Sequence, residues 1–399
     1  MPLARLGPPL PMLGFLAAAA AMFAAMYSTQ AILPEIGAAF DVSPAQAGLS
    51  VSALVLAIIP GAWVWGPLSD RIGRRRTLVL ASGLLAPVSL AVACAPTFEA
   101  LVALRAAQGL VMPGLLTVGV PYVTAVFVPR FGARVMGWYM SSLILGGLVG
   151  RVGVALVAAG LGWRAALAAI AVLPLVATVV MRRSLPEAPA PPAAGMAGGG
   201  WWDPRLAGAL AVGPALFFAF VAAFTFVRFR LEAPPFDLSP VGSAAVFGLW
   251  VLGGLAPVAG RLVERRGWRW TAGLGLGLAL SGAALSLPDR LPAVICGLAL
   301  LVAGMFIGSV AAQVALGGVR SVRPGTAGAL YYSVYYVAGG AAAFLPGLAW
   351  QAGGWPAVVA CAAGVLGAAT VLLALLALPA RAAARRAAAA AGAPALRGA

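Results

Sequence analysis

The chain has 399 residues, of which 62% are hydrophobic and only 9% are charged, and its formal net charge is +16. A soluble domain normally carries about 25% charged residues, so the composition excludes a soluble globular protein and predicts one that crosses a membrane several times. Lysine and histidine are absent, which excludes a lysine-containing phosphate loop, a lysine Schiff base and histidine metal sites. We therefore expect no enzymatic activity, no cofactor and no metal. The arginines lie in short loops, which indicates membrane orientation rather than a nucleic-acid partner.

Twelve apolar segments are long enough to cross a bilayer as helices, which takes about 20 residues each. They are apolar on all sides, whereas the strands of a membrane barrel are short and alternate apolar with polar residues. The sequence therefore predicts an all-α membrane protein with twelve transmembrane helices. These helices are expected near residues 11–34, 46–68, 77–95, 100–127, 133–158, 164–181, 206–229, 240–262, 271–287, 291–317, 325–348 and 355–379.

The first predicted helix carries Tyr27 and Gln30 and ends near Glu35. None of the ten acidic residues lies in the middle of a predicted helix, so Glu35 is the first candidate for a proton carrier if a proton gradient supplies the energy. Arg105 and Arg151 are predicted on the same side of the membrane, where they would favour the ionised form of Glu35. The alternative is an ordinary solvated acid at a helix end.

A carboxylate and a run of arginines lie in the loop between the second and third predicted helices, within GPLSDRIGRRR from Gly66 to Arg76. Charge is costly inside a bilayer, so this loop belongs at the membrane edge. An excess of arginine marks the cytoplasmic side. Twenty of the 26 arginines fall on this side and four on the opposite side, which predicts that both termini are cytoplasmic.

The fourth predicted helix contains the pattern Arg105-x-x-Gln108-Gly109. A charged residue at this depth is expected to face the interior of the helix bundle. The alternative is an arginine whose long side chain reaches back to the headgroups at the outer surface.

The fifth predicted helix contains Gly137, Gly146 and Gly150, followed directly by Arg151. Glycines at these intervals allow a neighbouring helix to approach closely. Close packing is therefore the minimal interpretation of the three glycines, and Arg151 is a second candidate for a charge that faces the bundle interior.

The segment from Pro186 to Gly200 is rich in proline, glycine and alanine and predicts a flexible linker. It separates six predicted helices from another six, and the halves resemble each other: Trp163 opens the sixth helix and Trp355 the twelfth. Two matching halves are typical of transporters whose binding site lies between them. We expect an amino-terminal six-helix bundle at 1–181, a cytoplasmic linker at 182–205, a pseudo-symmetric carboxy-terminal bundle at 206–380 and a basic cytoplasmic tail at 381–399.

With these features the chain resembles the major facilitator superfamily over essentially its whole length. One segment looks like the loop motif of that family, and the resemblance implies that it latches the two halves together in the outward-facing state. Its residues are Gly66, Asp70, Arg71, Gly73, Arg74 and Arg75.

Two further motifs are similar to those of a subgroup of this family, the drug:proton antiporters. Arg105 and Gln108 resemble a motif of proton-coupled members, and the glycines of the fifth helix match most of the antiporter motif. The chain departs from that motif where Arg151 replaces a proline and where Val154 and Ala155 replace paired glycines.

The resemblance also implies a central cavity between the halves. For the tyrosines among its candidate lining residues, the alternative is an aromatic belt at the membrane surface. The candidates are Tyr27, Gln30, Arg105, Gln108, Tyr139, Ser142, Gln313, Tyr332 and Tyr336.

The sequence favours a secondary transporter that works by alternating access, with proton-coupled efflux of small organic compounds or drugs as the leading hypothesis. The first alternative is an uptake permease for an organic anion held by Arg105 and Arg151, because arginine pairs well with carboxylates. An alternative of another class is a non-transporting receptor or scaffold. We expect a monomer in a bacterial inner membrane whose partners are lipid and a small-molecule substrate.

Overall fold

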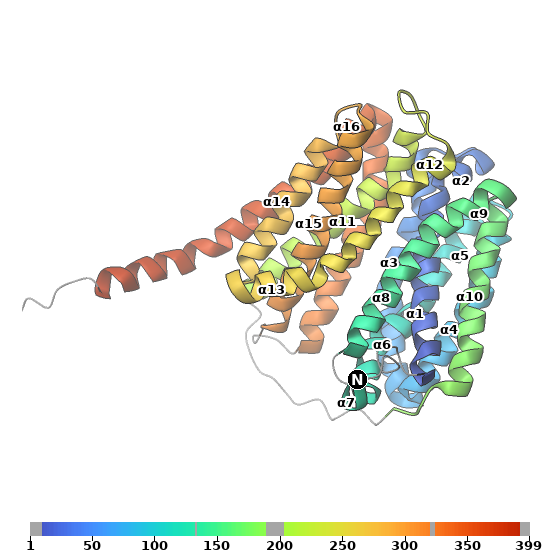
Figure 1. Cartoon of the computed structure of the whole chain (residues 1–399), viewed down its shortest axis with the longest axis horizontal. Helices are drawn as coiled ribbons and strands as arrows, with labels where there is room; N and C mark the ends of the chain where they lie inside the picture. The colour runs from blue at the N-terminus through green and yellow to red at the C-terminus, as the bar shows by residue number, and fades with distance from the viewer. Residues whose placement is uncertain (1–9, 132–133, 189–202, 320–323, 392–399) are drawn as a thin grey trace, which may run out of the picture.

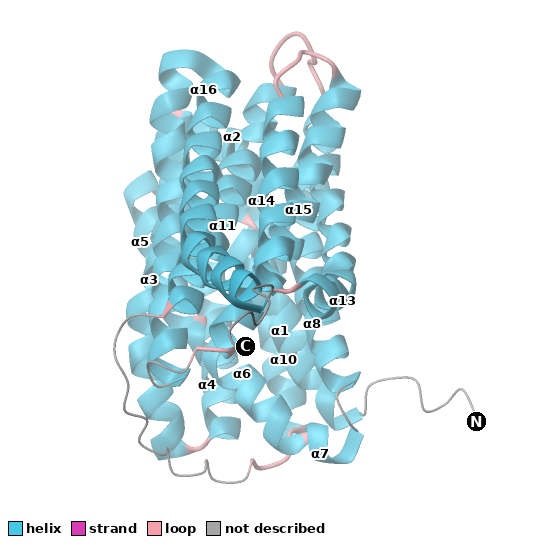
Figure 2. Cartoon of the chain, turned by 90° about the vertical axis from the view of Figure 1, so that its left-hand side faces the viewer, coloured by secondary structure: helices cyan, strands magenta, loops and turns pink. Residues whose placement is uncertain are grey.

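The structure is a computed structural model that describes residues 10–131, 134–188, 203–319 and 324–391 (Figure 1). All regular elements in these ranges are helices (Figure 2), which confirms the predicted all-α class. The helices form two side-by-side groups (Figure 1). We call α1–α10 the amino-terminal group and α11–α16 the carboxy-terminal group.

The amino-terminal group begins with two α-helices, α1 and α2, which are joined by a short 3₁₀ turn. Its elements are α1 (Leu10–Tyr27), the 3₁₀ turn η2 (Thr29–Ile32), α2 (Leu33–Phe40), α3 (Pro44–Ile72), α4 (Arg74–Ala93), α5 (Phe98–Val111), α6 (Pro113–Val126), α7 (Val128–Phe131), α8 (Arg134–Leu148), the π-helical turn η3 (Val149–Gly153), α9 (Val154–Leu161) and α10 (Trp163–Ser184).

Local sequence explains where α3 begins and ends. At its start, Ser43 Oγ accepts a hydrogen bond from the Gln46 backbone amide at 3.3 Å, and Gln46 Oε1 accepts one from the Ser43 amide at 2.9 Å. This reciprocal pair satisfies two backbone amides that the first turn of a helix leaves without partners. At its end, Gly73 has a φ of +88°, a conformation that only glycine adopts without strain, and the chain then turns back into α4.

The carboxy-terminal group contains a long 3₁₀ segment and one helix with a sharp kink. Its elements are α11 (Pro204–Leu231), α12 (Pro240–Ala244), the 3₁₀ segment η4 (Ala245–Leu255), α13 (Ala256–Arg266), α14 (Trp268–Leu285), α15 (Leu291–Gly317) and α16 (Pro324–Ala391). The kink in α16 falls at Gly353 and Gly354, whose backbone is not helical.

Ten segments of the described residues are long and apolar enough to cross a membrane, whereas the sequence pattern predicts twelve. Two particulars account for the difference. The tenth segment, Ala327–Leu376, contains the kink at Gly353 and Gly354. The helix α14 is not among the ten, because Trp268, Arg269 and Trp270 in its first turn lower its mean hydropathy.

The two ends of the helix bundle differ in charge and in packing. The end that carries the loop around Gly73 and the helix α7 is here called the arginine-rich end, at the bottom of Figure 1. The opposite end carries α2 and α12, at the top of Figure 1, and is called the arginine-poor end.

The two groups pack closely near the arginine-poor end, where α3 lies against α16. Ser52 Oγ donates a hydrogen bond to the Gly340 carbonyl at 2.7 Å. One turn earlier, a Cβ atom added at Gly48 would overlap the backbone of Ala343. Such contact requires the absence of side chains at the crossing point, as in other close-packed membrane helices.

Contact between the groups is looser toward the arginine-rich end. On α3, Trp63 is 68% exposed, and on α16, Tyr332 is 48% exposed. A Cβ atom added at Gly66 would meet no other atom within 4 Å. Figure 1 shows the two groups diverging in this direction, so the interface between them is closed at one end only.

Two glycines hold the fifth predicted helix against the first. A Cβ atom at Gly146 would overlap the backbone of Ala20, and one at Gly150 would overlap the backbone of Ala24. Backbone atoms cannot move aside as a flexible side chain can, so α1 and α8 are in direct main-chain contact. The surroundings of Gly137 lie outside the described residues.

This contact leads to a stability prediction for Gly146. Replacing Gly146 with alanine is expected to lower the free energy of unfolding by about 1–3 kcal/mol, because the added methyl group forces the two backbones apart. Thermal unfolding of the protein in detergent measures the change. The matched control is Gly160→Ala, since a Cβ there would meet no atom within 4 Å. Equal unfolding temperatures for the two variants would contradict the prediction.

Candidate functional site

The arginine-rich loop makes its contacts within the amino-terminal group. Arg74 Nη1 donates to the Pro121 carbonyl at 3.4 Å. Arg75 donates to the carbonyls of Leu185 at 2.7 Å and Arg182 at 2.9 Å, and forms an ion pair with Glu187 at 3.0 Å. The side chains of Asp70 and Arg71 are exposed, and Gly66 and Gly73 have open surroundings. In this conformation the described contacts of the predicted latch do not join the two groups.

Arg105 is fully buried, and all of its described hydrogen bonds stay within the amino-terminal group. Its Nε donates to the Ser50 carbonyl at 3.0 Å, Nη1 to the Ala25 carbonyl at 2.8 Å and Nη2 to the Met26 carbonyl at 2.8 Å. Nη1 also donates to Gln108 Oε1 at 2.6 Å. The carbonyls of residues 25 and 26 belong to the last turn of α1, where a helix carries partial negative charge. Arg105 is thus positioned to hold the end of α1 against α3 and α5.

A substitution of Arg105 is therefore expected to affect stability first. Arg105→Lys should lower the free energy of unfolding by about 2 kcal/mol, since one ammonium group cannot reach acceptors on three helices. Ligand affinity should change little in the protein that stays folded. Thermal unfolding and a binding assay measure the two effects, with the exposed Arg71→Lys as control. Normal stability together with lost transport would instead place Arg105 in the transport cycle, as the sequence motif suggests.

Arg151 has quite different surroundings. It lies in the π-helical turn η3, is fully buried, and faces the carboxy-terminal group. Its Nε donates to Gln30 Oε1 at 3.0 Å, and Nη1 donates to the Gly147 carbonyl at 3.3 Å. Its Nη2 has no hydrogen-bond partner, and no ion pair among the described residues includes Arg151. A buried cation without an acid partner is costly, and π-helical turns are frequent at functional sites.

A short chain of hydrogen bonds joins Arg151 to the opposite group. Gln30 accepts from Arg151 and donates through its Nε2 to Thr225 Oγ1 on α11 at 3.2 Å. Gln30 and Thr225 are both buried. The site therefore takes residues from η3, from η2 and from α11, and it spans the interface between the groups.

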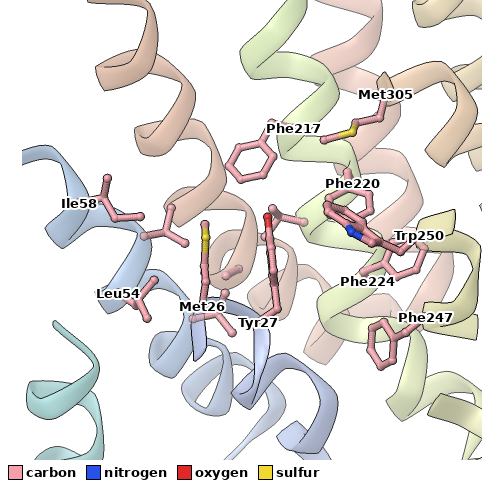
Figure 3. Close-up of a cluster of buried hydrophobic side chains, with 14 of the residues drawn as sticks. Met26, Tyr27, Leu54, Ile58, Phe217, Phe220, Phe224, Phe247, Trp250 and Met305 are labelled. Atoms are coloured by element: carbon pink, nitrogen blue, oxygen red, sulfur yellow. The ribbon is translucent and has the colours of Figure 1, made fainter. Parts of the chain in front are cut away.

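Aromatic rings surround the guanidinium group. Its Cζ lies 3.6 Å from the ring centroid of Tyr27 and 4.4 Å from that of Trp250. Phe220 and Phe247 follow at 5.6 Å and 5.8 Å. Figure 3 shows Tyr27 of the amino-terminal group on the side that faces Phe220 and Trp250 of the carboxy-terminal group. Rings at these distances attract a cation through their faces and exclude water from it.

Sequence reasoning missed Trp250 and Phe247. Both lie in η4, which has three residues per turn instead of 3.6. A helical-wheel reading of the eighth predicted helix therefore assigns their faces incorrectly. The signal that could have found them is the pair of aromatic residues in the eighth predicted helix, because ligand sites are often lined by aromatic side chains.

Glu35 lies at the arginine-poor end in a cluster centred on Arg228, which we call the Arg228 cluster and which also contains Glu232 and Ser243. Arg228 is only 1% exposed, and its two Nη atoms each donate to a Glu35 oxygen at 2.9 Å. Its Nε donates to Glu232 at 2.8 Å and to Ser243 Oγ at 3.1 Å, and Nη1 also bonds the Ala31 carbonyl. Glu35 is thus half of an ion pair between the two groups.

Sequence reasoning did not single out Arg228, which is one of the four arginines predicted on the arginine-poor side. The separation of four residues between Arg228 and Glu232 is the signal that could have found the ion pair on one helix face. No local pattern indicates the pairing with Glu35, which is 193 residues away.

The remaining candidates of the predicted cavity lie at several places. Tyr139 is buried and stacks on Phe15 at 5.4 Å, and Ser142 Oγ donates to the Tyr139 carbonyl at 2.7 Å. Tyr332 and Tyr336 stack on each other at 6.3 Å on α16. Gln108 is buried and donates to Ser89, and Gln313 is exposed.

The structure therefore brings Tyr27, Gln30 and Arg151 together but places Arg105, Gln108 and Gln313 elsewhere.

Comparison with known proteins identifies the broad class. The sequence profile of the Major Facilitator Superfamily matches residues 14–343. The inner membrane transport protein YnfM of Escherichia coli (strain K12) is 30% identical over 359 residues, which cover 87% of this chain and 85% of YnfM. The 3-(3-hydroxy-phenyl)propionate transporter of Escherichia coli (strain K12) is 34% identical over 153 residues, which are 38% of each chain.

The nucleoside transporter NupG has a similar fold, with a TM-score of 0.72 at 15% identity, covering 92% of this chain and 100% of NupG. At this low identity the likeness concerns the fold alone. The family and the full-length relative are transporters, so the protein is a multi-pass membrane transporter and not an enzyme. Because the family profile matches most of the chain and a full-length relative is 30% identical, the chain belongs to the Major Facilitator Superfamily.

Proposed function

We propose that the protein is a proton-coupled transporter of small organic anions, with Arg151 as the group that binds the anionic end of the substrate. The observation that carries the proposal is the buried guanidinium of Arg151, which among the described residues has one nitrogen without a partner and no ion pair with an acid. A carboxylate supplies both the missing charge and the missing acceptor. The position at the interface between the groups is where an alternating-access carrier binds its substrate.

We further propose that the protein has twelve transmembrane helices in two halves. The kink at Gly353 and Gly354 divides the last long segment into two spans, and α14 supplies one more. The halves are 1–181 and 206–380, with a linker at 182–205 and a tail at 381–399. The excess of arginine at the arginine-rich end favours a cytoplasmic location for that end and for both termini, in a monomer that resides in a bacterial inner membrane.

The described conformation then corresponds to the inward-facing state. The Arg228 cluster and the contact between α3 and α16 close the arginine-poor end, and the groups diverge toward the opposite end. The proton gradient supplies the energy in this proposal, and Glu35 is the carboxylate whose environment changes most when the arginine-poor end opens.

One relative supports an anionic substrate. The partial match to a 3-(3-hydroxy-phenyl)propionate transporter concerns a protein named for an organic acid. Arg151 provides the complementary charge in this chain. Drug efflux remains the second candidate function, and the observation that favours it is the aromatic lining formed by Phe220, Phe247 and Trp250, because such linings accept amphipathic compounds in general.

Transport by purified protein in liposomes tests the proposal. An imposed pH gradient should drive accumulation of radiolabelled organic acids above the level in protein-free liposomes, which control for passive permeation of weak acids. A protonophore should abolish the difference. Accumulation of cationic dyes with no response to any acid would contradict the anion proposal and favour drug efflux. The absence of transport for every solute tested would favour a receptor.

A further inference from the structure

We propose that the anion bound at Arg151 is a small aromatic monocarboxylate, whose carboxylate reaches Arg151 and Trp250 and whose ring joins the cluster around Trp250. This inference rests on the proposed function and narrows it from organic anions in general to one chemical class. Charge, hydrogen-bond donors and ring contacts each support it.

The charge of the site indicates a single negative charge on the ligand. Arg151 is the cation of the site, and its neighbours Tyr27, Phe220, Phe247 and Trp250 are uncharged. Arg228 is the next buried arginine at the interface, and two carboxylates already engage it. A second carboxylate on the ligand would be buried among rings without a partner, which is costly.

Two hydrogen-bond donors at the site lack acceptors. They are Arg151 Nη2 and Trp250 Nε1. Both side chains contact Gly147, since a Cβ added there would lie 2.6 Å from Trp250 Nε1 and 3.3 Å from Arg151 Nη1. Buried donors are rarely left unpaired. A carboxylate has two oxygens, so one group can accept from both donors.

The side-chain amide of Gln30 is already engaged through both its oxygen and its nitrogen. Gln30 accepts from Arg151 and donates to Thr225. A sugar or another hydroxyl-rich solute would therefore find few partners here and would lose its hydrogen bonds to water. The rest of a ligand at this place has to be apolar.

Ring contacts make an aromatic group the best match for that apolar part. Trp250 lies 5.3 Å from Phe220, 5.3 Å from Phe306 and 5.5 Å from Tyr27, measured between ring centroids. Figure 3 shows Phe220 and Phe224 of α11 beside Trp250. Aromatic pairs at such distances attract each other beyond the effect of buried area, so a ligand ring gains from contacts that a saturated ring does not make.

Equilibrium binding to the purified protein in detergent tests the inference. Radiolabelled benzoate is displaced by phenylacetate, by the cyclohexyl counterparts of both acids, by benzyl alcohol and by phthalate. The aromatic acids should bind about three- to tenfold more tightly than the cyclohexyl acids. Benzyl alcohol and phthalate should bind at least about tenfold more weakly than benzoate, because one lacks the charge and the other carries a second one.

Variants of Trp250 test the donor directly. Trp250→Phe keeps a ring but removes Nε1, and it should weaken the binding of both aromatic acids by about tenfold. The matched control is Trp63→Phe, because Trp63 is 68% exposed and lies far along α3 from the site. Gel filtration verifies that each variant is folded.

The outcomes separate this inference from the proposed function. Equal affinity for cyclohexyl and aromatic acids, with both lost in Arg151→Gln, would overturn the aromatic assignment and leave the anion transporter intact. Tight binding of phthalate would overturn the restriction to one carboxylate. Transport of uncharged or cationic solutes with no binding of any acid would overturn both proposals.

Discussion

Replacing Arg151 with glutamine is expected to lower the rate of organic-anion transport by about 100-fold or more, because a buried charge partner is lost from the binding site. The glutamine side chain is nearly as long as the aliphatic part of arginine, and its amide can still donate to Gln30 and to the Gly147 carbonyl. It cannot supply the positive charge that compensates a carboxylate among rings. The measurement is initial uptake of a radiolabelled acid into liposomes that contain equal amounts of each protein.

The same substitution should not destabilise the protein. Arg151 has no acid partner among the described residues, and one of its nitrogens is unpaired, so the folded state carries the cost of an uncompensated buried charge. The unfolding temperature of Arg151→Gln is expected to equal or exceed that of the parent. Lost transport with retained stability is the combination that identifies a binding group.

Arg164→Gln serves as the control for Arg151. Arg164 also lies against an aromatic ring, with its Cζ 4.1 Å from the Trp163 ring centroid, but it is exposed and distant from the interface. Its substitution should leave transport within about twofold of the parent, since exposed interactions contribute little. If Arg151→Gln transports acids as fast as Arg164→Gln does, the binding role of Arg151 is wrong.

The second large effect is expected at Arg228. Arg228→Gln should open the arginine-poor end, because Glu35 and Glu232 then face each other across the interface without the cation that joins them. Glu35 is 27% exposed and Glu232 20% exposed, so removing the cation costs less than in a fully buried pair, on the order of 1–3 kcal/mol. That amount is enough to shift the population from the closed form to a form in which the two groups separate at this end.

The reactivity of a single introduced cysteine measures this opening. Ala343 is buried where α16 lies against α3, so Ala343→Cys should react slowly with a membrane-impermeant thiol reagent. The native Cys94, Cys296 and Cys361 are first replaced by serine. Adding Arg228→Gln to this background should raise the labelling rate by at least about tenfold.

Two single carboxylate variants complete the comparison. Glu35 and Arg228 belong to different groups, whereas Glu232 directly follows α11 as its C-cap, one turn after Arg228. Glu35→Gln should therefore increase labelling of the cysteine much more than Glu232→Gln. Equal labelling in both variants, or no increase in Arg228→Gln, would show that the Arg228 cluster does not keep the arginine-poor end closed.

The sequence predicted the elements of the fold because those depend on local composition. Continuous apolar runs act within a few residues of chain, and so do the cap at Ser43 and the turn at Gly73 that the structure shows. The predicted all-α class is confirmed, and the profile match and the full-length relative show the family that the sequence motifs resemble. The predicted number of twelve helices stays a prediction beside the ten segments that are long and apolar enough.

The sequence did not distinguish the two arginines inside predicted helices. Arg105 and Arg151 each occupy an apolar segment and looked like equivalent candidates. In the structure, Arg105 reaches three carbonyls and Gln108 within its own group, and Arg151 keeps a free nitrogen among rings at the interface. The difference arises from how each helix is rotated and which neighbour it meets, and neither is a property of the segment itself.

By itself, the sequence determined an all-helical membrane protein with an arginine-rich end, and it named Glu35, Gln30 and Arg151 among its candidates. Only the tertiary structure decided that Glu35 pairs with Arg228 and that Trp250 covers Arg151. Both contacts join residues about a hundred or more positions apart across the interface between the groups. Such pairs form through the packing of whole helices, where depth, rotation and a 3₁₀ segment set which side chains meet, and no local pattern encodes that choice.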